Sequence, residues 1–372
     1  MPTDNQKTIS VLFITRAYGQ TAGGMERLSY ELIEAAKGNK HLTVSVIAPW
    51  WKPLASLPMQ RLLSAVFAVT VVPYALFVAR TKDVVHIGDP VLSLVGWLIQ
   101  KIWRKPIAVT VHGLDIVYDS GLYKYYLTKF FQNFALYLPI SSHVTKILAA
   151  RGVTGNIFLL RPGVHDRYSD STIRREDLQS ISALKNINLS SKIIFTAGRL
   201  IKRKGHAWFI QHVLPALPAD VIYIIAGDGP EKILIEKTAR ESGVSSRVVL
   251  LGRVSDHDLK ILYNTIDVFV QPNITLTGDV EGFGLVLLEA ALCGRSVIAA
   301  STEGVRDAIE PGKNGVLVEI ANPDAWQRAI QQELQHPSIR DGRTYTKDTF
   351  SWNTVAAKFT NALRSTVSES RK

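Results

Sequence analysis

Short apolar runs recur along the whole chain and are separated by segments of helical length. In the first half they read ISVLFIT, LTVSVIAP, DVVHIG, PIAVTVHG, LYLPIS and NIFLLRPG, and in the second half KIIFTAGR, VIYIIAGDG, VVLLGRV, DVFVQPN, SVIAAS and GVLVE. Runs that are rich in Val and Ile and apolar on both sides are typical of parallel strands covered by helices on each face. The pattern predicts an α/β protein with two doubly wound, Rossmann-like parallel sheets, one in each half.

A polar stretch at residues 165–192 lacks a strand pattern and separates the two sets of strands, as a hinge region would. We therefore expect an N-terminal Rossmann-like domain at residues 1–168 and a C-terminal one at residues 169–349. In open parallel sheets, ligands bind beyond the carboxyl ends of the strands. The predicted fold is thus two such domains that face each other across a cleft for the substrates.

The last segment, residues 350–372, carries apolar residues at helical spacing, namely Trp352, Val355, Phe359 and Leu363. We expect a helix there that packs back on the N-terminal domain. Such a helix would tie the two ends of the chain together.

Residues 62–79 are 18 consecutive uncharged residues, close to the length that spans a membrane. Pro73 interrupts this stretch, and the strand-like run at residues 83–88 follows at once. We expect a buried or surface-docked helix rather than a membrane span.

Positive charge is concentrated in the first half of the chain. The net charge is +11; residues 1–168 hold 18 Lys and Arg against 9 Asp and Glu, whereas the rest holds 25 against 23. This asymmetry indicates an anionic partner for the first domain. No zinc finger, recognition-motif aromatics or basic run accompanies it, so nucleic acid is not expected. An anionic membrane surface, an anionic acceptor and charge that serves solubility alone remain the alternatives.

The chain begins with MPTDNQKTISVLFITRAYG, which enters a strand without the charged and apolar regions of a signal peptide. Its single cysteine, Cys293, cannot form an internal disulfide and lies in an apolar helical context, which is typical of an inert core thiol. We expect a cytoplasmic protein that binds the inner face of the plasma membrane peripherally.

Three loops after predicted strands carry candidate binding residues. Gly23 and Gly24 precede a helix whose first N–H groups could face an anion, although the Gly-Lys-Ser/Thr ending of a P-loop is missing. His112 stands at the carboxyl end of a strand, where a side chain points toward ligand. Residues 225–230, IAGDGP, form a tight turn. For each of these loops a purely structural role is the alternative.

Four basic residues crowd into residues 197–205, AGRLIKRKG, directly after a predicted strand: Arg199, Lys202, Arg203 and Lys204. A guanidinium and an ammonium at the end of one strand can bind a pyrophosphate. The guanidinium can donate two parallel hydrogen bonds, and the ammonium acts as a point charge. The alternative is a solvated basic turn.

Two carboxylates flank a glycine-opened apolar helix in residues 281–294, EGFGLVLLEAALCG. Glu281 is expected in a loop, and Glu289 about one and a half turns inside a helix that begins near Phe283 or Gly284. Glu289 would accept hydrogen bonds from a vicinal diol such as a ribose, and Glu281 from the hydroxyls of an attached sugar.

The N–H groups of residues 283–285 would face the same anion as the basic turn. Together these features indicate a clamp on a sugar nucleotide. A glycosidase acid and nucleophile are one alternative, but eight residues of continuous helix separate the carboxylates by about 12 Å, beyond the roughly 5 to 9.5 Å that those mechanisms use. Surface carboxylates without a role are the other.

The combination of motifs resembles glycosyltransferase family 4, a family of retaining GT-B glycosyltransferases. Glu281 and Glu289 match its E-x7-E signature, and the similarity covers nearly the whole chain. The matching segments are GGMERL, VHGLD, GRLIKRKG, LLGRVSDHDLKILYNTIDVFVQP and EGFGLVLLEAALCGRSVIAASTEGVRDAI. LLRPGVH departs from the Asn-Gly-Val-Asp that members often have, because Pro162 and His165 take its ends.

The resemblance implies a role for each candidate residue. Arg199 and Lys204 would bind the donor diphosphate, and Glu289 the ribose. Glu281 and His112 would contact the transferred sugar. The backbone would supply the other contacts: Gly282, Phe283, Gly284 and Leu285 to phosphate and sugar, Arg253 and Val254 to the base, and Gly23 and Gly24 to the diphosphate and acceptor.

The resemblance also implies the activity, which is retaining transfer of a sugar from a nucleotide-sugar donor to a lipid-linked or polysaccharide acceptor. The family typically needs no metal, no other cofactor and no enzyme nucleophile. This is physically reasonable because preorganised cations and helix N–H groups stabilise the nucleoside diphosphate as it leaves. No Asp-x-Asp metal motif is evident in a suitable loop.

Two other functions on the same fold remain open. A sugar-nucleotide 2-epimerase would act without an acceptor and would need acid/base carboxylates in the first domain, where Asp89 and Asp115 are the candidates. The other is a sugar-nucleotide-binding partner subunit that has lost catalysis. The intact donor motifs speak against it.

Overall fold

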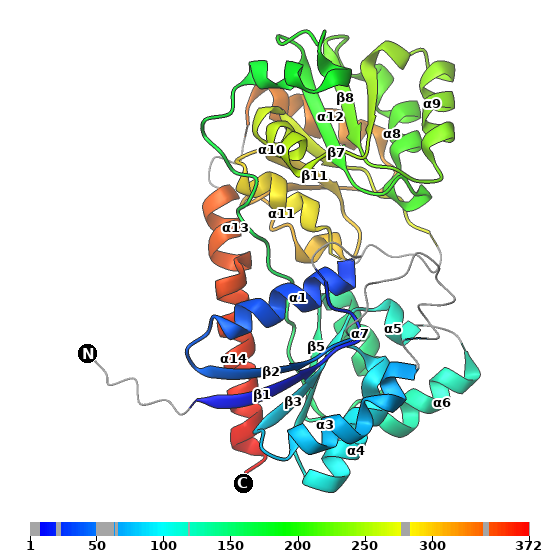
Figure 1. Ribbon diagram of the computed structural model, residues 1–372. Coiled ribbons are helices and arrows are strands. Elements are labelled where there is room, and N and C mark those ends of the chain that lie inside the picture. The colour runs from blue at the N-terminus through cyan, green and yellow to red at the C-terminus, as the bar shows by residue number, and fades with distance from the viewer. Residues whose placement is uncertain are drawn as a thin grey trace. The chain divides into compact units, whose positions relative to one another are not determined.

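The computed structural model describes residues 8–19, 24–49, 63, 66–117, 120–276, 283–337 and 342–371. The chain divides into two compact units (Figure 1). Unit 1 comprises residues 1–163 and 352–372, and unit 2 comprises residues 164–351.

The boundary between the units lies before Val164 rather than at residue 168. The N–H of Val164 donates to the carbonyl of Phe350 (2.8 Å), and the ring of Tyr168 packs on that of Tyr263, with the centroids 5.3 Å apart. Both contacts lie within unit 2 and draw the preceding residues into it. Because the chain leaves unit 2 again after Ser351, unit 2 is a continuous insertion in unit 1.

The polar stretch at residues 165–192 is folded onto unit 2 and is not an open hinge. It forms 3₁₀ turns at Arg175–Ser180 and Ser182–Leu184. Leu178 and Leu184 are buried in the core of unit 2. The prediction of a hinge is wrong because a few well-spaced apolar residues dock a segment whose composition is mostly polar.

Unit 1 is built on a parallel sheet of six strands in the order β2-β1-β3-β4-β5-β6. The strands are β1 (Ile9–Ile14), β2 (Leu42–Ile47), β3 (Val84–Ile87), β4 (Ile107–Val111), β5 (Leu136–Pro139) and β6 (Asn156–Ile157). Side chains alternate between the two faces of a strand, so a sheet covered on both sides needs apolar residues at every position. This explains the uninterrupted Val and Ile runs.

Helices cover both faces of this sheet (Figure 1). The helices are α1 (Gly24–Lys37), α3 (Val72–Ala79), α4 (Ser93–Trp103), α5 (Leu114–Val117), α6 (Gly121–Phe130), α7 (Ser142–Ala150) and α14 (Trp352–Glu369). α1 and α14 pack with Val11 and Phe13 on one face, whereas α3, α4, α6 and α7 pack with Leu12 and Ile14 on the other. Helix α14, which comes last in the sequence, is therefore part of the core of unit 1.

Unit 2 has a second parallel sheet of six strands, in the order β12-β11-β10-β7-β8-β9. The strands are β7 (Lys192–Ala197), β8 (Val221–Ala226), β9 (Val248–Gly252), β10 (Val268–Gln271), β11 (Ser296–Ala300) and β12 (Val316–Val318). One face is covered by α8 (His206–His212), α9 (Lys232–Glu241) and α12 (Pro323–Gln335), and the other by α10 (Asp256–Thr265), α11 (Leu285–Leu292) and α13 (Gly342–Phe350). Two parallel sheets with helices on both faces confirm the predicted fold class.

Cys293, directly after α11, is buried in this second core. Burial raises the pKa of its thiol to about 12. The thiol therefore stays protonated at neutral pH, in agreement with the expected inert core cysteine.

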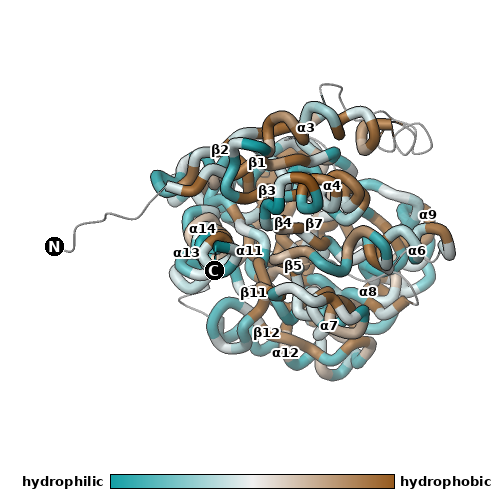
Figure 2. Tube along the Cα trace, turned by 90° about the horizontal axis from the view of Figure 1, so that it is seen from below, coloured by the Kyte–Doolittle hydropathy of each residue, from teal (hydrophilic) through white to brown (hydrophobic). Residues whose placement is uncertain are grey.

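The uncharged stretch at residues 62–79 is helical where the structure describes it, over residues 66–70 and in α3. Phe67, Val71 and Ala75 bury one face of it in unit 1. Figure 2 shows the tube around α3 coloured as hydrophobic over much of its length. Among the described residues, no helix combines the length and the apolar character needed to cross a membrane.

Two buried histidines should make the fold sensitive to acid. His86 of unit 1 and His206 of unit 2 are each 3% exposed, and burial lowers the pKa of each to about 3. In the unfolded chain the pKa returns to about 6.5, so below that pH the unfolded state binds protons that the folded state does not. The free energy of unfolding should therefore fall as the pH decreases, by up to about 1.4 kcal/mol per pH unit for each histidine.

The variants His86→Gln and His206→Asn are expected to lose less stability in acid than the wild type does. The urea midpoint of unfolding, determined at pH values between about pH 7 and about pH 4, measures this difference. Nε2 of His86 lies 2.8 Å from Oγ1 of Thr110, and Nδ1 of His206 lies 3.0 Å from the hydroxyl of Tyr223. Gln and Asn place an amide at these positions and do not titrate. Variants that lose stability in acid as steeply as the wild type would contradict the prediction.

Candidate functional site

The strand order of unit 2 reverses between β7 and β10, which are neighbours in the sheet although two strands separate them in the sequence. At such a switch point the connections leave on opposite sides of the sheet, so the carboxyl ends of the strands are open to a ligand. Because all the strands are parallel, the loops after β7, β8, β9 and β10 share this edge.

The predicted basic turn follows β7 and is fastened to the end of β10. Lys202–Lys204 form a 3₁₀ turn that ends at Gly205, whose φ is 69°. A Cβ on Gly205 would lie 1.9 Å from the carbonyl oxygen of Pro272, so only glycine permits this approach. The N–H of Ile274 donates to the carbonyl of Arg203 (2.9 Å), which holds the turn in place.

The basic side chains of this turn differ in exposure. Arg203 is 7% exposed, whereas Arg199 and Lys202 are exposed and Lys204 is half-buried. The ammonium of Lys204 lies beside Gly198, since a Cβ built on this glycine would be 4.0 Å from Nζ. Arg199 and Lys204 thus flank the end of β7 as predicted, while Arg203 belongs to the packed interior.

Glycines bring the loops after β7, β8 and β9 into backbone contact. Gly227, at the start of the GDGP turn, has a φ of 145°, and a Cβ there would lie 1.8 Å from the carbonyl oxygen of Gly198. Its N–H donates to the carbonyl of Gly252 (2.7 Å). The turn therefore joins the loops of the edge and shapes the backbone beside the candidate phosphate site.

Arg253 and Val254, the predicted base-binding positions, follow β9 at this edge. The side chain of Arg253 is 88% exposed, and its Nε lies 3.7 Å from Oδ2 of Asp228 in the GDGP turn. Val254 is half-buried against the core. Their position beside the glycine-rich backbone fits contacts by the main chain rather than by the side chains.

Helix α11 begins at the same edge. Its N-cap, Gly284, is left-handed with a φ of 83°, and the helix starts at Leu285. A Cβ on Gly284 would lie 2.9 Å from Cδ1 of Leu287 and 3.5 Å from Nε2 of Gln271 at the end of β10. Phe283 is buried in the core. The first N–H groups of the helix have no partner within it and carry partial positive charge.

Glu281 and Gly282 lie outside the described residues. The assignment of Glu281 to the hydroxyls of a transferred sugar, and of Gly282 to the donor, therefore stays a prediction.

The basic turn and the start of α11 meet just at the end of β10. Gly205 contacts Pro272 and Gly284 contacts Gln271, and these two contacted residues are adjacent in the chain. A cationic turn beside the backbone of Pro272 and a helix N-terminus beside the side-chain amide of Gln271 can together bind a doubly charged anion such as a diphosphate.

Glu289 lies inside α11 and is 9% exposed. The hydroxyl of Tyr263 donates to its Oε2 (3.0 Å), and Nη2 of Arg167 is 3.8 Å from its Oε1. Burial, together with the negative charge of Glu289, raises the pKa of the Tyr263 hydroxyl well above its ordinary value. Tyr263 therefore remains a hydrogen-bond donor and orients the carboxylate, which can still accept bonds from a diol.

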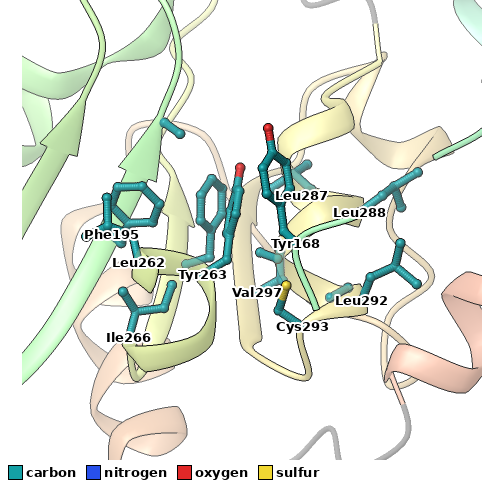
Figure 3. Packing of buried hydrophobic residues seen from close by; sticks show 14 of the residues in the cluster. Tyr168, Phe195, Leu262, Tyr263, Ile266, Leu287, Leu288, Leu292, Cys293 and Val297 are labelled. Atoms are coloured by element: carbon teal, nitrogen blue, oxygen red, sulfur yellow. The ribbon is translucent and has the colours of Figure 1, made fainter. Parts of the chain in front are cut away.

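Arg167 and Tyr168, in the stretch predicted as a hinge, belong to this cluster and were not among the predicted site residues. The guanidinium of Arg167 lies 4.5 Å from the ring centroid of Tyr168, and its Nη2 donates to the Tyr168 hydroxyl (2.5 Å). That hydroxyl in turn donates to Oδ1 of Asp256 (3.0 Å). Figure 3 shows the hydroxyls of Tyr168 and Tyr263 pointing the same way beside α11. The only sequence cue is an Arg-Tyr pair in a polar segment, which local pattern does not distinguish from a solvated linker.

In unit 1, His112 follows β4 and is held by two contacts. Its N–H donates to Oδ2 of Asp115 (3.0 Å), and its ring Nε2 lies 3.1 Å from the carbonyl oxygen of Gly88, after β3. A carbonyl can only accept, so we assign the proton to Nε2. Nδ1 is then the ring atom that can contact a ligand, as the predicted role of His112 requires.

Asp89 and Asp115, the candidate acid/base pair of an epimerase, both have structural partners. Asp89 is fully buried, and its Oδ1 accepts from Nε of Arg16 (3.0 Å) and from the N–H of Val91 (2.9 Å). Asp115 accepts from two main-chain N–H groups, one of them that of Gly113 (2.7 Å). Burial raises the pKa of the Asp115 carboxyl, although the neighbouring His112 and the main-chain hydrogen bonds that the carboxylate accepts oppose this. These carboxylates shape the loops after β3 and β4, which favours a structural role.

Helix α1 begins at Gly24, whereas Gly23 lies outside the described residues. Glu26 stands in the first turn of this helix. Across the part of the chain that the structure describes, no three His, Cys, Asp or Glu side chains gather as a metal site would need.

Two family models match the chain. One, described as "Glycosyl transferases group 1", matches residues 179–347, and the other, "Glycosyltransferase Family 4", matches residues 22–168. The first match lies within unit 2, and the second lies in unit 1 apart from its last residues.

Curated relatives are similar over most of the chain. The GDP-mannose-dependent alpha-(1-6)-phosphatidylinositol monomannoside mannosyltransferase of Mycobacterium tuberculosis is 25% identical, and the alignment covers 95% of this chain and 98% of that protein. The D-inositol 3-phosphate glycosyltransferase of Corynebacterium diphtheriae is 26% identical over 83% of this chain and 75% of that protein.

Solved structures share the fold. HepE of Anabaena in complex with UDP superposes with a TM-score of 0.72 at 18% identity, covering 96% of this chain and all of that chain. The sucrose-phosphate synthase of Thermosynechococcus elongatus gives a TM-score of 0.72 at 19% identity, covering 97% of this chain and all of that one.

Proposed function

Because the chain belongs to the group 1 glycosyltransferases and has their GT-B fold, we propose that it is a retaining enzyme acting on a lipid-linked or polysaccharide acceptor. The use of a nucleotide sugar follows from the family. The proposed place of reaction is the cytoplasmic face of a membrane.

One observation carries the proposed donor site. The turn that bears Lys204 lies against Pro272, and the N-terminus of α11 lies against Gln271, the last residue of β10 and the one before Pro272. The donor diphosphate binds there, with Arg199 as the second cation. As the sugar leaves, negative charge grows on the diphosphate, and fixed cations and N–H groups stabilise that charge more in the transition state than in the bound donor.

The proposed reaction needs no base on the protein. The bond between the anomeric carbon and the diphosphate oxygen breaks, and the acceptor oxygen forms a bond on the same face of that carbon. The acceptor proton passes to the departing diphosphate oxygen. Cationic side chains take the place of a metal ion, and no cofactor is required.

The other contacts are part of the same proposal. Glu289 accepts hydrogen bonds from the ribose diol, and the main chain at Arg253 and Val254 contacts the base. His112 accepts a hydrogen bond through Nδ1 from a hydroxyl of the transferred sugar. Glu281 contacts the same sugar.

A glycolipid acceptor is supported by the activities for which relatives are named. The Mycobacterium tuberculosis relative is named as a transferase to a phosphatidylinositol mannoside, whose glycan is attached to a lipid. The excess of basic residues in the first half of the chain suits an anionic acceptor or headgroup.

The donor site is tested by thermal stabilisation with UDP, GDP, ADP and their sugars. We expect one base to stabilise the protein, by about 2.7 kcal/mol when the ligand is at 100 times its Kd. A chelator should leave this stabilisation unchanged, since the cations are side chains. If no nucleoside diphosphate has any effect, the proposed site is wrong. Product formed without acceptor would favour an epimerase, and binding without hydrolysis or transfer would favour a silent subunit.

A further inference from the structure

The helical segment around α3 is apolar on the side that faces away from the core. Val69, Tyr74 and Phe77 are 63%, 61% and 65% exposed, although Ala75 and Ala79 of the same helix are fully buried. Tyr74 and Phe77 stand three residues apart in α3 and so share one face of it, away from the buried alanines, and Val69 extends the exposed apolar surface into the preceding helical residues. A helix that covers a sheet of a soluble domain normally carries polar residues on that outer side.

The neighbouring helices continue this surface. The indole N–H of Trp103, at the end of α4, donates to the carbonyl of Leu76 in α3 (3.0 Å), and Trp97 of α4 packs edge-on against Phe130 of α6 at 5.3 Å. All three helices bury their inner sides on the same face of the sheet. Their outer sides therefore point away from that face together. We call this outer layer the α3–α6 surface.

Exposed large apolar residues occur on each of the other two helices as well. Ile102 and Trp103 at the end of α4 are 51% and 39% exposed, and Leu122 and Tyr125 of α6 are 82% and 64% exposed. Single exposed apolar residues are common on soluble proteins, but a group that runs over three adjacent helices marks an interaction site.

The charge of this surface has one sign. Residues 66–82, 93–105 and 121–130 contain seven Lys and Arg and no Asp or Glu. The exposed members are Arg80, Lys101, Arg104, Lys124 and Lys129. Cationic groups also lie close to aromatic rings, with the Arg80 guanidinium 5.5 Å from the Phe77 ring and the Lys129 ammonium 6.0 Å from the Tyr125 ring.

Arg104 occupies a position that usually belongs to glycine. It caps α4 in the left-handed conformation, with φ 52° and ψ 29°, where an L side chain is disfavoured. Its side chain borders an open hollow of about 480 Å³, together with Trp97, Gln100, Lys101 and Asn133. Arg104 thus holds a strained helix cap beside the ammonium of Lys101 and the indole of Trp97. This combination is suited to bind a phosphate headgroup.

We propose that the α3–α6 surface docks on a bilayer that contains anionic phospholipid, with α3 lying in the interface and Lys101 and Arg104 contacting headgroup phosphates. This deepens the proposed function, because it names the surface by which the enzyme reaches a lipid-linked acceptor. Apolar and aromatic side chains among basic residues without acids are the combination that partitions into an anionic interface. A second copy of the chain is a less suitable partner, because a symmetric interface would place seven positive charges opposite seven more.

Flotation of the full chain with phosphatidylcholine vesicles, with and without phosphatidylglycerol, tests the inference at about 0.1 M salt. The wild type should float with the anionic vesicles only, and less at higher salt. Tyr74→Ser with Phe77→Ser should lower binding at least about tenfold, because two interfacial side chains are lost. Arg104→Gly should lower it about fivefold, while thermal stability stays the same or rises because the strained cap is relieved.

Ile233→Ser with Leu234→Ser is the matched control, since these residues of α9 are 77% and 45% exposed but lie among both acids and bases. It should bind vesicles as the wild type does. Binding that survives the α3 and Arg104 substitutions, or a wild type that does not float, would overturn the proposal. So would a wild-type dimer in solution that Tyr74→Ser with Phe77→Ser dissociates, because a second copy would then cover the surface.

Nucleotide-dependent stabilisation separates this inference from the proposed function. The surface variants should keep the stabilisation of the wild type. Vesicle binding without any nucleotide effect would refute the donor site and support the membrane-docking surface. A nucleotide effect without vesicle binding would support the donor site and refute the docking surface.

Discussion

Lys204→Ala is expected to lower the rate of sugar transfer about 10²- to 10³-fold, the usual effect of removing one preorganised charge-stabilising group. The ammonium of Lys204 lies beside Gly198, and its turn is locked to β10 through Gly205. It can therefore meet the departing diphosphate without rearrangement. Transfer rates at saturating donor measure the effect, because a group that acts mainly in the transition state lowers kcat and kcat/KM together.

Lys202→Ala is the matched control, because Lys202 stands in the same 3₁₀ turn but is exposed to solvent. It should change the rate by no more than about twofold, as loss of a solvated charge does. Equal losses in both variants would show that only the general positive field matters, and a wild-type rate for Lys204→Ala would place the diphosphate elsewhere.

Glu289→Gln is expected to lower kcat/KM by about 10²-fold, mainly through weaker donor binding. The substitution keeps the size of the side chain but removes the negative charge, and a hydrogen bond to a charged acceptor contributes about 1.5 to 3 kcal/mol. In the proposed complex, the ribose diol makes such bonds to Glu289. Titration calorimetry with the nucleoside diphosphate, next to steady-state kinetics, measures the loss.

Tyr263→Phe and Arg167→Ala distinguish binding by Glu289 from a purely structural role. Tyr263 orients the carboxylate and Arg167 lies 3.8 Å from it, but neither is assigned to the ribose. Each should lower donor affinity about tenfold or less, as loss of one orienting bond does. If Glu289→Gln destabilises the fold as much as Tyr263→Phe yet leaves donor affinity intact, Glu289 is only a packing partner.

Much of the fold could be predicted from local pattern. The Val- and Ile-rich runs identified both sheets, because a strand buried on two faces must be apolar throughout. NIFLLRPG is the exception, since its strand is reduced to Asn156–Ile157 at the sheet edge. The connecting stretch was misjudged because docking by Leu178 and Leu184 depends on the unit 2 core, which local composition does not report.

Part of the candidate site could also be predicted from local pattern, and part could not. Lys204 and Gly284 were predicted from residue type and position, since basic residues and glycines directly after parallel strands stand at the edge where ligands bind. Arg167 was not, because its contact with Glu289 joins residues far apart in the sequence. The contact of Gly205 with Pro272 also joins residues far apart in the sequence, and it holds the basic turn in place.

The insertion of unit 2 within unit 1 has a consequence for biosynthesis. During translation, β1 to β6 emerge first, but α14, whose Trp352, Phe359 and Leu363 cover one face of their sheet, emerges only after all of unit 2. A ribosome-bound chain therefore holds an incomplete first domain, in which α1 alone covers part of that apolar sheet face, while the second domain can already fold. A premature stop codon shortly before Trp352 would spare unit 2 and leave unit 1 prone to aggregation.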